Sequence, residues 1–262
     1  MGVSMGVPVP TSPADPAAMA EVADAVLRLG EQLRGAAADT LVEAVIEHAV
    51  AALPGVRWAS ITTLRQGRFR TLAATGEEAR AADAIQYELG SGPCVDAVLE
   101  DSVHLSEDLA VDGRWPVYGA RAAEELGMRS ALAYRLTLVA DPDLLAGLNL
   151  YSDVPDAFDA ATVWAGTLLA THAAWAVSLE LTRQRAEQLE VALRSNREIG
   201  TAIGVLMAQH KLTRDQAHEL LRVASQDGNR KMAAIAAEVV ETGQLSMPRR
   251  PARPGPGAGD GR

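Results

Sequence analysis

The stretch RSNREIGTAIGVLMAQHKLTRDQAHELLRVASQDGNRKMAAIAAEVVETG, residues 194–243, is the most informative part of the chain. Apolar residues recur in it every three or four positions, in three successive groups, which predicts three short helices with little chain between them. Thr213 and Gln216 have the spacing of a capping box, which predicts that the second helix starts here. Asn229 is placed to cap the third helix, and Gly243 is placed to end it. The stretch therefore predicts a compact three-helix bundle.

The order of residues in this stretch resembles the ANTAR domain, a three-helix output module of bacterial signalling proteins. Domains of this family bind paired hairpins in nascent messenger RNA and oppose transcription termination. The resemblance therefore implies an RNA-binding antitermination domain over residues 194–245. The positions that carry it are Ala192, Leu193, Arg194, Ile199, Ala202, Gly204, Leu206, Met207, Ala217, Leu220, Leu221, Ser225, Asn229, Lys231, Ala236 and Val239.

Basic and amide side chains in this region are the candidate RNA contacts. Lysine and arginine neutralise phosphate, whereas guanidinium planes and amides can read the unpaired bases of a hairpin loop. Residues 194–243 contain no Phe, Tyr or Trp, so bases cannot stack there on an aromatic ring. The alternative role for each candidate is a solvated surface charge. The candidates are Arg194, Arg197, Lys211, Asn229, Arg230 and Lys231.

The central part of the chain predicts an α+β domain in which helices flank an antiparallel sheet. Two runs of alternating residues around Gln66-Gly67 predict a hairpin of two strands. A short strand is expected within residues 102–110, and two longer ones are expected at 130–139 and 144–152. Helices are expected within 21–53, at 77–85, 94–100 and 114–127, and from Phe158 onward.

This region resembles the GAF domain, a small-molecule or redox-sensing module. The resemblance covers about residues 35–178, and GAF followed by ANTAR is a pairing typical of actinobacterial regulators. It implies a sensor for a small-molecule or redox signal that the sequence does not identify. The segments that carry the resemblance are LGSGPCVDAV (89–98), DLAVDGRWPVY (108–118), LAYRLTL (132–138), LAGLNLYS (145–152) and AFD (157–159).

The two resemblances together imply how the chain is divided. We expect a flexible leader at 1–20, a GAF-like sensor domain at 21–178, a coiled-coil linker helix at 179–193, an ANTAR domain at 194–245 and a disordered tail rich in Pro, Gly and Arg at 246–262. The fold expected is α+β, with a long connecting helix between the sheet domain and the three-helix bundle.

The segment between the two domains predicts a coiled-coil seam. No Pro or Gly occurs between Thr167 and Ile199, so the last sensor helix is expected to run unbroken into the first bundle helix. We expect a parallel homodimer in which the sensor sets the register or separation of the two helices. The alternative is a single amphipathic helix that packs on its own domain. Apolar or small residues alternate at spacings of four and three: Leu168, His172, Trp175, Leu179, Thr182, Ala186, Leu189 and Leu193.

The sequence carries no signature of an enzyme. It lacks a phosphate-binding GK[ST] motif, an HExxH motif and a GxSxG motif. The five histidines are scattered without a partner at metal-ligand spacing, so neither a metal nor another cofactor is expected. Methionine sulfoxide reduction, which some GAF proteins perform, requires two cysteines, and this chain has one.

The single cysteine, Cys94, is a candidate sensor residue. It follows Gly-Ser-Gly-Pro and is expected near a helix N-terminus, where the helix dipole lowers the pKa of a thiol and raises its reactivity. The alternative is a buried structural cysteine.

The distribution of charge places any nucleic-acid contact in the C-terminal third. The net charge of the chain is −10. Residues 181–262 carry 13 Lys or Arg and 9 Asp or Glu, a net charge of +4, whereas residues 1–180 carry 11 and 25, a net charge of −14. No apolar run reaches the length of a membrane span, and no secretion signal is recognisable. We therefore expect a cytoplasmic, RNA-binding regulator; the alternative is a sensor or adaptor whose helical C-terminal domain binds protein or duplex DNA.

Overall fold

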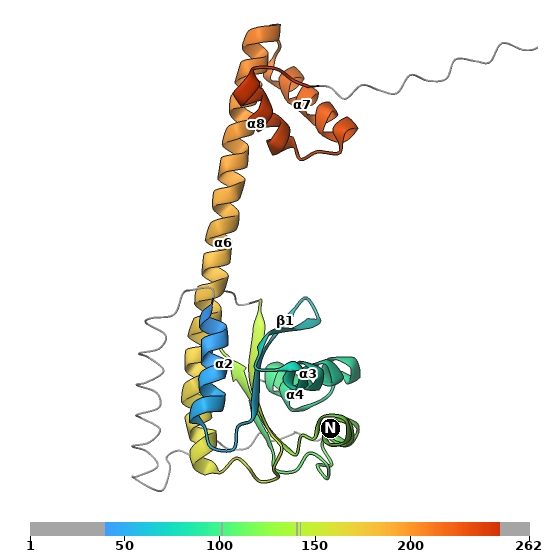
Figure 1. Ribbon diagram of the computed structural model, residues 1–262, viewed down its shortest axis with the longest axis vertical. Helices are drawn as coiled ribbons and strands as arrows, with labels where there is room; N and C mark the ends of the chain where they lie inside the picture. Colours follow the sequence, from blue (N-terminus) through green and yellow to red (C-terminus); the bar gives the residue numbers. More distant parts are fainter. Residues whose placement is uncertain (1–39, 101, 140, 142, 247–262) are drawn as a thin grey trace, which may run out of the picture. The chain divides into compact units, whose positions relative to one another are not determined.

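A computed structural model describes residues 40–100, 102–139, 141 and 143–246 of this chain (Figure 1). The chain divides into two compact units, with the boundary between Gln184 and Arg185. The predicted leader at 1–20, the first part of the predicted N-terminal helix and the predicted tail from 247 onward lie outside the described residues.

The N-terminal unit is built on a five-stranded sheet in the order β2-β1-β5-β4-β3. Every neighbouring pair of strands is antiparallel, which confirms the predicted fold class. The predicted hairpin is confirmed too: Gln66 and Gly67 both have positive φ, as a two-residue turn between twisted strands requires. The strands are β1 (Trp58–Arg65), β2 (Arg68–Ala74), β3 (Val103–Ser106), β4 (Ser130–Leu136) and β5 (Leu145–Ser152).

Helices cover both faces of this sheet (Figure 1). One face packs against α2 (Leu41–Ala52) and the first turns of α6 (Ala160–His210). The other face packs against α3 (Glu77–Leu89), α4 (Pro93–Glu100) and α5 (Pro116–Leu126).

Because strand side chains alternate between faces, each strand supplies both layers. In β5, Leu148 and Leu150 belong to the apolar core shared with α2 and α6. Asn149 and Tyr151 point to the other face, where they form hydrogen bonds with α3.

The C-terminal unit is the predicted three-helix bundle. It consists of the last turns of α6 together with α7 (Arg214–Gly228) and α8 (Met232–Thr242). The first of the three predicted short helices is therefore the end of one continuous helix of 51 residues, as the absence of Pro and Gly up to Ile199 indicated. No described helix has a stretch with the length, hydropathy and low charge needed to cross a bilayer. The core residues of the bundle are Ala202, Ile203, Leu206, Ala217, Leu221, Ala224, Ile235, Ala236 and Val239.

The capping signals in the bundle are confirmed with one correction. Thr213 and Gln216 form both bonds of the capping box at the start of α7. Gly243 ends α8 in the left-handed conformation. Asn229 does not cap α8, as the sequence predicted; it ends α7 with φ 47° and ψ 41°. Asparagine tolerates this left-handed conformation, and α8 instead follows Lys231, which makes no side-chain cap bond.

Candidate functional site

The turn between α7 and α8 carries three of the predicted RNA contacts. Its backbone is fixed to the end of α7: the Arg230 amide donates to the Ser225 carbonyl at 3.1 Å, and the Asn229 amide donates to the Gln226 carbonyl at 3.3 Å. This is the bonding of a Schellman motif. The Ser225 hydroxyl donates in return to the Arg230 carbonyl at 2.6 Å. The turn therefore presents the exposed side chains of Asn229 and Lys231 from a defined backbone.

Arg230 differs from its two neighbours because its charge is compensated within the unit. Its guanidinium donates to Glu238 Oε2 at 2.8 Å and so links the turn to α8. Hydrogen bonds from Ser246 and from Arg230 hold the pKa of the Glu238 carboxyl below its usual value. Lys231, by contrast, forms no ion pair with any described residue and leaves its charge open to solvent.

Arg194 and Arg197 lie on α6 toward the same end of the bundle as this turn. Ile199 and Met232 both pack against the bundle core. A Cβ at Gly243 would lie 3.2 Å from Gln209 Nε2, so α8 ends beside Gln209. Both guanidinium groups are exposed, and neither is in an ion pair within the described part of the chain.

Lys211 lies at the opposite end of the bundle. It follows the last residue of α6 and has a positive φ of 52°. The 15 residues of α7 separate it from the α7–α8 turn, a length of about 22 Å at 1.5 Å per residue. The structure thus brings five of the six predicted residues to one end, the contact end, and leaves Lys211 away from them. Arg214, which the sequence did not single out, is exposed beside Lys211 at the start of α7.

The sensor candidate Cys94 is buried near the start of α4 and is 1% exposed. It packs with Leu64 and Val98. Burial, reinforced by the nearby carboxylate of Asp83, raises the pKa of its thiol to about 12. The predicted lowering of this pKa by the helix N-terminus is therefore wrong, because desolvation outweighs the helix dipole. The alternative prediction, a buried cysteine, describes what the structure shows.

A buried polar cluster that sequence reasoning missed lies between α3 and the sheet. At its centre is Asp83, which is fully buried and accepts hydrogen bonds at 2.8–3.1 Å. Desolvation raises the pKa of its carboxyl to about 6, although the hydrogen bonds oppose the rise. The sequence contained an indication of this burial, because Asp83 follows Ala79 by four residues and so falls on the buried face of α3. Its four donors are Ser60 Oγ, Thr71 Oγ1, Asn149 Nδ2 and Tyr151 OH.

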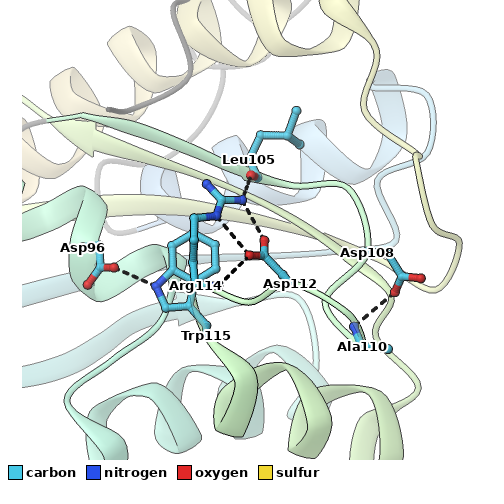
Figure 2. Close-up of polar contacts among 7 residues, drawn as sticks. All are labelled: Asp96, Leu105, Asp108, Ala110, Asp112, Arg114 and Trp115. Carbon is cyan, nitrogen blue, oxygen red and sulfur yellow. Dashed lines mark hydrogen bonds and ion pairs between the residues drawn. The ribbon is translucent and has the colours of Figure 1, made fainter. Parts of the chain in front are cut away.

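The loop between β3 and α5 forms a second polar arrangement (Figure 2). The Arg114 guanidinium lies 4.3 Å from the centre of the Trp115 ring, pairs with Asp112 at 2.7 Å and donates to the Leu105 carbonyl. Trp115 Nε1 donates to Asp96 Oδ2 on α4 at 2.6 Å. These contacts are internal to the domain. This part of the motif at 108–118 therefore fixes the loop before α5 to α4 and to β3. Within the described ranges, no three His, Cys, Asp or Glu side chains are arranged to hold a metal ion.

Comparison with known families identifies both units. The model of the GAF domain matches residues 35–178, more than half of the chain, and the model of the ANTAR domain matches residues 187–240. GAF and ANTAR domains are sensory and regulatory domains, although some proteins similar to GAF domains are enzymes. No curated protein matches this sequence.

Several solved structures are similar to this chain at low sequence identity. A GAF domain from a phosphoenolpyruvate-protein phosphotransferase of Coxiella burnetii is 16% identical, with a TM-score of 0.49, covering 66% of this chain and 98% of that one. The photosensory core module of the Stigmatella aurantiaca phytochrome is 13% identical, with a TM-score of 0.53, covering 87% of this chain and 47% of that one. An enzyme is also among the similar structures: free methionine-R-sulfoxide reductase from Neisseria meningitidis is 13% identical, with a TM-score of 0.44, covering 67% and 98%.

Proposed function

The chain belongs to the GAF domain family, and from this premise, with the ANTAR match at 187–240, we propose that it is an RNA-binding transcription antitermination regulator. The GAF domain receives a small-molecule or other signal, and the ANTAR domain binds paired hairpins in nascent messenger RNA. The protein acts without catalysis, and it acts in the cytoplasm, where the RNA is made. The observation that carries the proposal is the contact end of the bundle.

The contact end suits RNA because it combines uncompensated positive charge with an exposed amide. Lys231, Arg194 and Arg197 can each neutralise a phosphate. The Asn229 side chain stands next to Lys231 on a turn whose backbone is already ordered, so little conformational entropy is lost when it contacts a base. Arg230 holds the turn through Glu238 and is a positioning residue rather than a phosphate contact.

Binding to paired hexaloop hairpins tests the proposal, with single hairpins of random sequence and duplex DNA as competitors. Lys231→Glu is expected to weaken hairpin binding about tenfold or more and to reduce its dependence on salt, because one phosphate contact becomes a repulsion. A gel-shift titration of the full-length protein measures both.

Lys211→Glu is the matched control, since it makes the same charge change at the opposite end of the bundle. It is expected to change the affinity less than about threefold, through general attraction alone. Equal losses in the two variants would contradict the contact end as the RNA site. Equal binding of hairpins and duplex DNA would favour an adaptor that recognises nucleic acid without regard to loops.

A second copy of the chain completes the proposed regulator. Four of the eight predicted seam positions on α6 are large apolar residues that are more than half exposed: Trp175 at 73%, Leu179 at 51%, Leu189 at 60% and Leu193 at 60%. Leu168, the first seam position, packs instead on the core of its own unit. A parallel dimer along the remaining seam would bury these side chains and would bring two contact ends together for two hairpins.

Leu189→Asp combined with Leu193→Asp is expected to raise the dissociation constant of the dimer about a hundredfold or more, because each substitution buries a charge in the seam. Sedimentation of the full-length protein measures this. Val191→Asp is the control, since Val191 is 66% exposed on the same helix but lies off the seam. A wild-type protein that sediments as a monomer at micromolar concentration would remove the dimer.

A further inference from the structure

The carboxylate of Asp83 is buried without a positive partner. Its side chain is 0% exposed, and all four of its hydrogen-bond donors are neutral. No Lys, Arg or His forms an ion pair with it among the residues that the structure describes. Burying a charge in this way is costly, so a proton is the simplest species that can relieve it.

Among the titratable groups of this cluster, Asp83 is the one whose charge changes near neutral pH. The titratable ones are a thiol and three phenols, and burial raises the pKa of each, so all four stay neutral well above pH 8. The pKa of Asp83 itself is raised to about 6. The facing groups are Tyr87 from α3, Cys94 from α4, Tyr118 from α5, Tyr151 from β5, and the hydroxyls of Ser60 and Thr62 from β1 and Thr71 from β2.

The amide of Asn149 is oriented for the ionised form of Asp83. Its Nδ2 donates to Asp83 Oδ1 at 3.1 Å, to Ser60 Oγ at 3.0 Å and to Thr62 Oγ1 at 3.2 Å. Its Oδ1 is buried and has no hydrogen-bond partner among the described residues. A half-turn of the amide would exchange these atoms and bring an acceptor, with its lone pairs free, to the carboxyl of Asp83.

We propose that Asp83 and Asn149 form a proton-operated switch in the GAF domain. One proton from solvent adds to a carboxylate oxygen of Asp83, the amide of Asn149 turns, and the new O–H group donates to Asn149 Oδ1. No other covalent bond changes. The switch deepens the proposed function by naming a signal, and it rests on that function only for its effect on RNA binding.

A chain of hydrogen bonds connects the switch to α4. Tyr151 OH donates to Asp83 at 2.8 Å and accepts from Gln86 Nε2 at 3.1 Å. Gln86 Oε1 in turn accepts from the Cys94 amide, in the first turn of α4, at 2.8 Å. When Asn149 turns, Asp83 Oδ1 loses one donor, and this is the same oxygen that accepts from Tyr151 OH. The change therefore reaches both β5, which carries Asn149 and Tyr151, and the start of α4.

Infrared difference spectroscopy of the full-length protein tests the switch. Protein labelled with ¹³C-aspartate is titrated between pH 8 and pH 5, and the band of a protonated aspartic acid is followed. We expect this band to appear with a midpoint near pH 6 in the wild type and to be absent over that range in Asp83→Asn. Glu78→Gln, an exposed change on the same helix, should retain it.

The absence of an isotope-sensitive carboxylic acid band above pH 5 in the wild type would overturn the proposal. This measurement uses the wild-type protein alone, so it does not depend on whether a variant folds. A band that persists in folded Asp83→Asn would overturn it as well. The amide signal of ¹⁵N-labelled Asn149 side chains should shift with the same midpoint, and an unchanged signal would refute the turn of the amide.

Hairpin binding measured at pH 5.5 and pH 7.5 tests the regulatory link separately. In the wild type the affinity should change by several fold more than in Asp83→Asn. If the protein binds hairpins with the same pH dependence in both variants, the switch does not regulate RNA binding. If it binds no RNA at either pH, the proposed function fails, and the carboxyl titration alone decides whether the switch exists.

Discussion

Gly119→Ala is expected to destabilise the N-terminal unit by about 3 kcal/mol or more. Gly119 lies in α5, where an added Cβ would come within 1.9 Å of the Leu109 carbonyl oxygen. The atom that the new Cβ would meet belongs to the backbone, so it cannot turn aside as the end of a flexible side chain could. Leu109 is 1% exposed and its amide donates to the Arg129 carbonyl at 2.6 Å, so the loop cannot move without breaking that bond.

Urea unfolding of the full-length protein, followed by tryptophan fluorescence, measures this effect. All four tryptophans precede Arg185, so the signal reports on the N-terminal unit alone. Gly113→Ala is the matched control, because Gly113 is exposed in the loop just before α5 and a Cβ there would meet no atom within 4 Å. Similar unfolding midpoints for the two variants would show that α5 and the loop can separate freely.

The N-terminal unit is expected to gain stability from Asp83 as the pH falls from 8 to 4. The pKa of Asp83 is about 6 in the folded protein against a usual value of 3.8, so the folded state binds the proton more tightly. The contribution to stability is therefore complete below about pH 4 and is lost as the pH rises through 6. The pKa difference corresponds to a change on the order of 3 kcal/mol in the free energy of unfolding.

Asp83→Asn removes the contribution of the Asp83 titration to stability and leaves all other titrations in place. The free energy of unfolding of the wild type, minus that of the variant, should fall by roughly 3 kcal/mol between pH 4 and pH 8. The same fluorescence measurement in urea gives both values at each pH. Glu78→Gln should give a difference that is nearly constant over this range, since Glu78 is exposed on the same helix. A constant difference for Asp83→Asn would mean that Asp83 is solvated as an ordinary surface carboxylate.

The sequence alone predicted the α+β class, the hairpin at Gln66-Gly67, the capping box at Thr213 and the end of α8 at Gly243. Each of these depends on contacts between residues close together in the chain: a period of two or 3.6, a turn that needs positive φ, or a hydroxyl three residues from its amide. It also predicted that α6 continues past the boundary at Arg185, because nothing in the segment breaks a helix.

What the sequence could not determine depends on residues far apart in the chain. The donors to Asp83 come from three strands, between 12 and 68 positions away, so its burial became visible only when those strands were placed beside α3. The pKa of Cys94 was mispredicted for the same reason, since the dipole of α4 is local whereas desolvation comes from the whole sheet.

In the bundle, the sequence identified the basic residues, and the tertiary structure sorted them. Arg230 forms an ion pair with Glu238, and Asn229 ends α7. Lys211 lies a helix length away from Lys231. The sequence determines the chemical type of each side chain. Packing between distant segments determines its neighbours, its solvation and hence its charge.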